Sequence, residues 1–251
     1  MTAYLYPILF VIFLWWISTG IVLWLARGRD EQMPVRLLGL TVLAAMGFAA
    51  ATISAHSQAG SAPYVGFAAA LSVWAWIEFT FLTGMITGSR AKPCPEHAGT
   101  RQRFWLAFKA IDRHELLLVG AMLALALVTF SGIDQTALWT FATLWVMRIS
   151  AKLTIFDGVP AFSHDMMPSK IAHLQSYFRV DRIGRVFWIS TTVSSLVLVA
   201  VLVAFMMGAV PDSMLTTTLI LTTLIALAAF EHWMMVLPIR DSALWQWAST
   251  N

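Results

Sequence analysis

The sequence predicts an all-α protein that crosses a membrane repeatedly: a bundle of seven transmembrane helices with the N-terminus outside and the C-terminus cytoplasmic. Hydrophobic residues make up 59% of the 251 positions and charged residues 12%, whereas a soluble domain carries about 25% charged residues. The apolar residues also gather into runs of about 20, the length that crosses a bilayer as a helix. These observations indicate a single integral membrane domain over residues 1–251.

Seven apolar runs lie between polar clusters, and each is interpreted as one span. The first run has no basic residue before it and no small-residue cleavage site after it, which indicates a retained helix rather than a signal peptide. The third run ends at the polar turn TGSRAKP, and the fifth carries two cations. The predicted spans cover residues 4–26, 37–53, 64–87, 114–130, 136–156, 186–207 and 214–237.

The basic residues predict the orientation of the bundle. All 16 Lys and Arg residues lie within segments 27–36, 90–113 and 148–185 or at Arg240. The alternate connections, around His56, Asp134 and Asp212, contain none. Because Lys and Arg flanking the spans stay on the cytoplasmic side, the N-terminus is expected outside. The net charge of +3 thus reflects topology and attraction to anionic lipid headgroups, and nucleic acid is not an expected partner.

Two cytoplasmic segments each have one apolar face. Segment 103–112 interleaves aromatic and basic residues. Segment 165–180 contains a proline suited to the first turn of a helix, followed by Ile171, Leu174 and Phe178 at helical spacing. We expect both segments to lie in the membrane interface, where such residues meet lipid headgroups, with docking of a partner protein as the alternative.

The cytoplasmic half of the fifth span, LWVMRISAKLTIFDGVP, places two cations inside the bilayer. Arg148 lies about 15 Å from the cytoplasmic end of the span at 1.5 Å per residue, and Glu78 on the third span lies at a comparable depth. An unpaired charge at such a depth costs about 2.5–3.5 kcal/mol on insertion scales. We therefore expect Glu78 and Arg148 to pair, and Lys152 to reach the interface, Glu115 or Glu231.

Two dipeptides, His114-Glu115 and Glu231-His232, lie in the same half of the membrane. Di-metal carboxylate bundles rely on Glu-x-x-His pairs on one helical face, a spacing that neither dipeptide has, so no metal site and no catalytic residue is predicted. His232, with His114 as a second candidate, has the chemistry of an axial ligand for a magnesium tetrapyrrole or haem, but a hydrogen-bonded core histidine fits as well. The predicted intramembrane polar cluster consists of Glu78, Glu115, Arg148, Lys152, Glu231 and His232.

The cluster has two interpretations, a structural polar network and a pocket for a pigment or quinone. Our hypothesis from the sequence is that Arg148 and Lys152 hold an anionic group. A tetrapyrrole propionate or a carboxylate of a partner protein would supply one.

Motifs across nearly the whole chain also resemble one protein family. The segment around Arg148 and Lys152 is the most specific of them. The motifs are YLYPILFVIFLWWISTGIVLWL, TGSRAKPCP, WTFATLWVMRISAKLTIFDGVP, DMMPSKIAHLQSYF and EHWMMVLP. Together they look like the PuhE family of photosynthetic complex assembly proteins, from purple and related phototrophic bacteria.

The resemblance implies a multi-pass protein of the bacterial cytoplasmic membrane, in its inner or intracytoplasmic photosynthetic form. It implies a factor that accompanies the reaction-centre genes, supports assembly of the reaction centre and core antenna, and affects bacteriochlorophyll supply. The implied partners are membrane lipids, subunits of these complexes or proteins of bacteriochlorophyll biosynthesis. The alternative is a membrane subunit of a tetrapyrrole-synthesising enzyme that binds substrate, quinol or metal at the polar cluster. Bacteriochlorophyll and haem are the candidate cofactors, and the resemblance supplies no catalytic residue.

Overall fold

The computed structural model describes residues 2–161, 167–237 and 241–248 of the chain. Within these ranges the regular secondary structure is helical, with no β-strand. Short 3₁₀ helices, η1 (Asp30–Gln32), η3 (Ser169–Tyr177), η4 (Asp212–Met214) and η5 (Asp241–Ala248), lie between or after the longer elements. The α-helices are α1 (Thr2–Arg27), α2 (Met33–Ala55), α3 (Ala62–Leu82), α4 (Thr100–Lys109), α5 (Asp112–Val128), α6 (Thr136–Asp157), α7 (Arg185–Met206) and α8 (Leu215–Met234).

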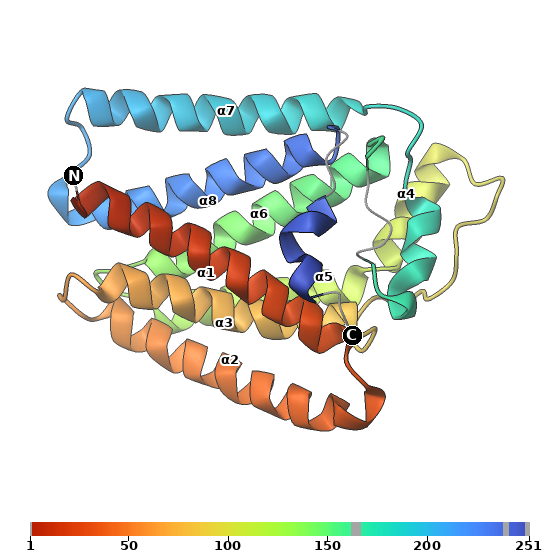
Figure 1. Ribbon diagram of the computed structural model, residues 1–251, viewed down its shortest axis with the longest axis horizontal. Coiled ribbons are helices and arrows are strands. Elements are labelled where there is room, and N and C mark those ends of the chain that lie inside the picture. The colour runs from red at the N-terminus through yellow and green to blue at the C-terminus, as the bar shows by residue number, and fades with distance from the viewer. Residues whose placement is uncertain (1, 162–166, 238–240, 249–251) are drawn as a thin grey trace.

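The long helices lie side by side and turn at alternate ends of the bundle (Figure 1). The connection between α1 and α2, helix α4 and the η3 segment gather at one end, and the N-terminus lies at the other. Five helices, α1, α2, α3, α7 and α8, are long and apolar enough to cross a membrane. The chain is therefore a multi-pass membrane protein by the composition of its helices.

Helices α5 and α6 match two of the predicted runs in position but are less apolar than the other five. The first turn of α5 carries Asp112 and Glu115, and α6 carries Arg148 and Lys152 near its middle. Charges set these two helices apart from the other five, and α5 is also shorter than they are, at 17 residues.

Helix α3 forms the centre of the bundle. It contacts α1, α2, α5, α6 and α8, and 67% of its most apolar window is buried, against 11% for α7. Helix α7 instead leaves large apolar side chains such as Trp188, Ile189 and Leu196 exposed. This distribution is that of a central helix surrounded by helices whose outer faces meet lipid.

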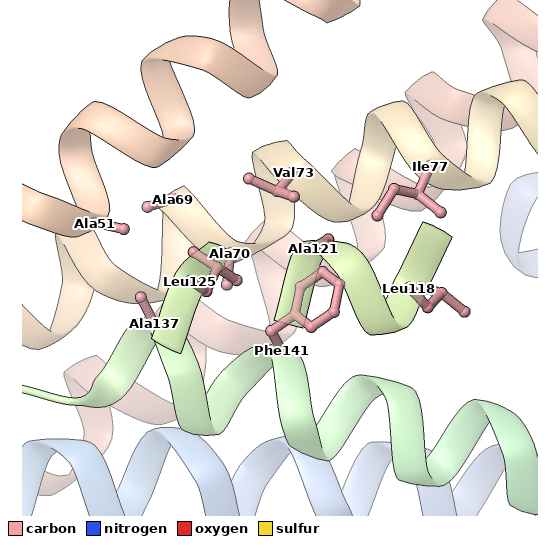
Figure 2. Packing of buried hydrophobic residues seen from close by; sticks show 10 residues of the cluster. All are labelled: Ala51, Ala69, Ala70, Val73, Ile77, Leu118, Ala121, Leu125, Ala137 and Phe141. Carbon is pink, nitrogen blue, oxygen red and sulfur yellow. The ribbon is translucent and has the colours of Figure 1, made fainter. Parts of the chain in front are cut away.

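Small residues bring α2 and α3 close together. Gly47, Ala51 and Ala55 lie on the buried face of α2, and a Cβ on Gly47 would lie only 2.9 Å from the carbonyl oxygen of Ala69 on α3. Such small-residue faces let helix backbones approach in a bilayer, where van der Waals packing drives association. The core around them (Figure 2) consists of Ala51, Ala69, Ala70, Val73, Ile77, Leu118, Ala121, Leu125, Ala137 and Phe141.

Helix α3 ends at Leu82, although the predicted span extends to residue 87. Gly84 has a φ of 74°, the left-handed conformation that glycine adopts just after a helix. The backbone N–H of Ile86 then donates to the carbonyl oxygen of Thr80. Residues 83–87 of the predicted span are thus a non-helical stretch that turns back toward the end of α3.

The two amphipathic segments differ in what they contact. Helix α4 leaves Phe104, Trp105 and Phe108 exposed, as an interfacial helix would. In η3, by contrast, Ile171 and Leu174 are buried with Phe81 and Ala110 in one cluster, and Phe178 packs against this cluster. The apolar face of residues 169–177 therefore packs against the bundle. Residues 165 and 166 of the predicted segment lie outside the described residues.

Candidate functional site

Arg148 on α6 meets Glu78 on α3. The distance between Arg148 Nη2 and Glu78 Oε2 is 2.7 Å, and this is the pair that their depths in the membrane favour. The two side chains differ in exposure: 38% of Arg148 is exposed, compared with 10% of Glu78. Glu78 Oε1 and Arg148 Nε are buried and have no hydrogen-bond partner. A single contact rather than a bidentate fork joins them, so the guanidinium keeps N–H donors that the pair does not use.

Lys152, one turn further along α6, meets Glu115 on α5. Lys152 Nζ lies 2.6 Å from Glu115 Oε1, and the Trp145 indole N–H donates to Glu115 Oε2 at 3.2 Å. Lys152 Nζ also lies 5.5 Å from the centroid of the Phe81 ring, within the range of a cation–π contact. The sequence left the interface, Glu115 and Glu231 open as partners of Lys152, and the structure places Glu115 there.

His232 lies in a hydrogen-bonded network between α6, α7 and α8. Its Nδ1 is 2.8 Å from the carbonyl oxygen of Ala228, which can only accept, so Nδ1 carries the proton. Its Nε2 lies 2.9 Å from Ser150 Oγ, and Ser150 Oγ lies 2.7 Å from Ser190 Oγ. Both ring nitrogens are occupied, which favours the core-histidine interpretation over an axial ligand.

His114 is fully buried at the start of α5. Its ring centroid lies 4.3 Å from that of Phe81, and neither ring nitrogen has a hydrogen-bond partner. Its backbone N–H donates to the carbonyl oxygen of Thr87 at 2.8 Å, which ties the non-helical stretch after α3 to α5. In the part of the chain that the structure describes, no group of three His, Cys, Asp or Glu side chains could hold a metal ion.

A cavity of about 420 Å³, partly open to its surroundings, lies beside the ion pairs. Its lining comes from α1, α3, α4, α6, α8, η3 and η5. Of the predicted site residues, the lining includes Glu78, Arg148, Lys152, Glu231, Ile171, Leu174 and Phe178. Glu115, His114 and His232 are not part of the lining. The predicted polar cluster is thus divided into residues that line the cavity and residues, Glu115 and His232, that lie outside the lining.

The η3 segment closes the cavity at the end where the basic connections gather. Arg103 on α4 holds it there, because one guanidinium N–H donates to the carbonyl oxygen of Tyr177 and another to that of Phe156, each at 2.8 Å. The Tyr177 hydroxyl in turn donates to the carbonyl oxygen of Lys92 at 2.8 Å. At the other end of η3, Lys170 forms an ion pair with Asp30.

The C-terminal segment η5 closes the cavity from the side of α1. The Trp245 indole N–H donates to the carbonyl oxygen of Trp16 at 3.0 Å, and the Trp16 indole N–H donates to that of Leu244 at 2.9 Å. The Trp247 ring fills the space above Gly20, where a Cβ would lie 2.0 Å from it. Trp245 is 5% exposed, and its ring packs edge-on against that of Trp15 on α1, with the ring centroids 5.5 Å apart.

These features define the class of the protein: a multi-pass, all-helical membrane protein whose bundle encloses a cavity beside paired charges. The chain belongs to the family described as "Protein of unknown function (DUF3623)", whose profile matches residues 1–251. It is 37% identical over 241 residues to a Rhodobacter capsulatus protein described as "Uncharacterized 30.4 kDa protein in puhA 5'region". That match covers 94% of this chain and 87% of the relative. No solved structure matches the chain.

Proposed function

We propose that this protein is a membrane assembly factor that supports formation of the photosynthetic reaction centre and core antenna. The observation that supports the proposal is the relative encoded in the puhA 5' region, which matches nearly the whole chain. The resemblance of the quoted motifs to the PuhE family supports the same role and a link to bacteriochlorophyll supply. The expected partners are subunits of these complexes or proteins of bacteriochlorophyll biosynthesis.

The proposal includes seven spans in the cytoplasmic membrane of a phototrophic bacterium, with the N-terminus outside. Helices α5 and α6 would complete the bundle formed by the five more apolar helices. The position of the basic connections at one end supports the orientation (Figure 1). In this arrangement α4 lies at the cytoplasmic surface, where its exposed Phe104, Trp105 and Phe108 would contact lipid headgroups.

The second candidate is a membrane subunit of a tetrapyrrole-synthesising enzyme. The cavity supports it, since about 420 Å³ falls within the about 300–1,000 Å³ typical of small-molecule sites. Lys152 and Arg148 on the lining would then orient a substrate. The assembly role is preferred because the interior charges are paired with one another rather than left available for acid–base chemistry.

A gene deletion in the native phototroph separates the two functions. If the protein is an assembly factor, the deletion strain should lose reaction-centre and core-antenna absorbance, and no tetrapyrrole precursor of bacteriochlorophyll should accumulate. An enzyme subunit predicts that one tetrapyrrole precursor accumulates in place of bacteriochlorophyll. Complementation with the wild-type gene is the control. Unchanged complex yield and unchanged pigments in the deletion strain would contradict both.

A further inference from the structure

Each of the two cations on the cavity lining, Arg148 and Lys152, already has a carboxylate partner. Arg148 is paired with Glu78, and Lys152 is paired with Glu115 behind the lining. A further carboxylate, Glu231, also lies on the lining. A ligand with its own negative charge would therefore add an uncompensated charge to a low-dielectric interior, which is costly. The geometry thus disagrees with the anionic ligand that the sequence suggested.

Hydrogen-bond donors, in contrast, remain available to the cavity. Arg148 uses Nη2 for Glu78, yet 38% of its side chain is exposed, and it lies on the lining. A guanidinium has five N–H donors and no acceptor. The group that matches this surface without adding charge is a neutral acceptor such as a carbonyl oxygen.

Apart from the hydroxyl groups of Ser18, Thr19, Thr143 and Tyr177, the rest of the lining is apolar and rich in aromatic rings. Aromatic rings stack on flat conjugated molecules in offset or edge-on geometries. The rings come from α1, α3, α6, η3 and η5, so they surround the cavity rather than form one wall. They are Trp15, Trp74, Phe81, Phe156, Tyr177, Phe178 and Trp245.

We infer that the cavity binds a neutral, flat, conjugated molecule that bears a carbonyl group, which accepts a hydrogen bond from Arg148. Two sources supply this chemistry in a photosynthetic membrane, a membrane quinone and the ring of a carbonyl-bearing pigment. The inference goes beyond the assembly role, because a cavity of this kind binds its ligand whatever complex the protein serves. It can be tested on the purified chain, independently of any effect on reaction-centre yield.

The test measures the binding of small-molecule probes to the detergent-purified full chain. Quenching of tryptophan fluorescence reports the binding. The probes are decylubiquinone, the esterified pigment bacteriopheophytin and, as an anionic control, oleate. We expect saturable binding of at least one neutral probe and markedly weaker binding of oleate. Tighter binding of oleate than of both neutral probes, or no saturable binding of either neutral probe, would overturn the inference. Which neutral probe binds identifies the source.

Two variants locate the site without relying on one side chain. Ala151→Phe places a ring on the lining between the two cations and leaves both ion pairs in place; Ala45→Phe, on the exposed face of α2, is its matched control. The double variant Arg148→Met, Glu78→Met removes the donor, adds no other donor and keeps the charge balanced. We expect Ala151→Phe and the double variant each to bind the neutral probe about tenfold more weakly or worse, and Ala45→Phe to bind it as wild type. Wild-type affinity in a folded Ala151→Phe protein would place the probe elsewhere.

Discussion

Arg148 Nη2 lies 2.7 Å from Glu78 Oε2, and this ion pair adds a polar link to the apolar packing of α6 on α3, the central helix of the bundle. Removing one partner of a buried pair costs about 3–5 kcal/mol because it strands the other charge. We expect Arg148→Ala to cost less than this range, since the side chain is 38% exposed. Combining it with Glu78→Ala should recover about 1–2 kcal/mol, measured as thermal unfolding in detergent and as protein level in the membrane. Strictly additive losses would mean that the two side chains are not coupled.

The second pair offers a comparison between a buried and an exposed lysine. Lys152→Met should lower stability by about 3–5 kcal/mol, because Glu115 is 15% exposed and would lose its charge partner. Lys170→Met, in the exposed pair with Asp30, should cost about 0–1 kcal/mol. The difference in unfolding temperature between the two variants is the measurement. Similar small losses in both would show that Lys152 reaches solvent.

Two glycines on α2 test the close packing against α3. Gly47→Ala places a Cβ 2.9 Å from the carbonyl oxygen of Ala69, and overpacking of this kind costs about 1–3 kcal/mol. Gly39→Ala, with nothing within 4 Å of the new Cβ, should stabilise the helix by about 0.5–1 kcal/mol. Opposite shifts of the unfolding temperature are expected. A neutral Gly47→Ala would mean that the two helices can move apart without loss.

Acidification should loosen the η3 segment. Burial lowers the pKa of His173 below its ordinary value of 6.5, so the folded state favours the neutral ring. The contribution of His173 to stability is therefore complete above pH 6.5 and is lost as the pH falls through this value toward the folded pKa, because the unfolded segment takes up the proton first. His173→Gln should remove this pH dependence.

The single cysteine provides the measurement for this prediction. Cys94 packs against the cluster formed by Ile171, Leu174 and Tyr177. Its backbone N–H donates to Ser176 Oγ at 2.8 Å, so it is held against the η3 segment. The measurement is the rate of Cys94 labelling in the wild-type protein divided by the rate in the His173→Gln variant at the same pH. This ratio should increase as the pH is lowered from about 7 to about 5. A constant ratio would show that His173 does not control the segment.

Reporter fusions test the proposed topology. Fusions after His56, Asp134 and Asp212 should read as external, and fusions after Glu96 and His164 as cytoplasmic, because every Lys and Arg lies on the side of the latter two. A cytoplasmic signal after Asp134 would mean that α5 and α6 do not both cross the membrane. Fusions after Asp212 then report whether α7 and α8 keep their orientation.

Depth along a helix was sufficient to predict which charges meet. Glu78 and Arg148 lie at matching distances from the ends of the predicted spans, although α3 itself ends at Leu82. A bilayer leaves an interior charge few alternatives to the nearest opposite one. The end of α3 at Leu82 also had a signal in the sequence, Gly84, although the apolar residues around it concealed the break. Local rules therefore account for the helices and for one ion pair.

The cavity itself could not be predicted from helix patterns. Its lining includes η3 and η5. Both contact helices that are distant from them in sequence, and a helical repeat of apolar residues does not predict such contacts. The apolar face of Ile171 and Leu174 has the same spacing whether it meets lipid, a partner or the bundle. Only the tertiary contacts of Arg103 and Tyr177 decide among these. His232 likewise has both ring nitrogens occupied only because Ser150 on another helix lies 2.9 Å from Nε2.

The two ion pairs have a consequence for how the chain enters the membrane during synthesis. Arg148 and Lys152 each disfavour insertion of α6 by about 2.5–3.5 kcal/mol when they stand alone. Their carboxylate partners belong to α3 and α5, which leave the ribosome before α6 does. In the proposed seven-span arrangement, α6 would therefore depend on earlier helices that are still beside the translocon when it arrives. The N-terminal half of the chain would then assist the insertion of the segment that follows it.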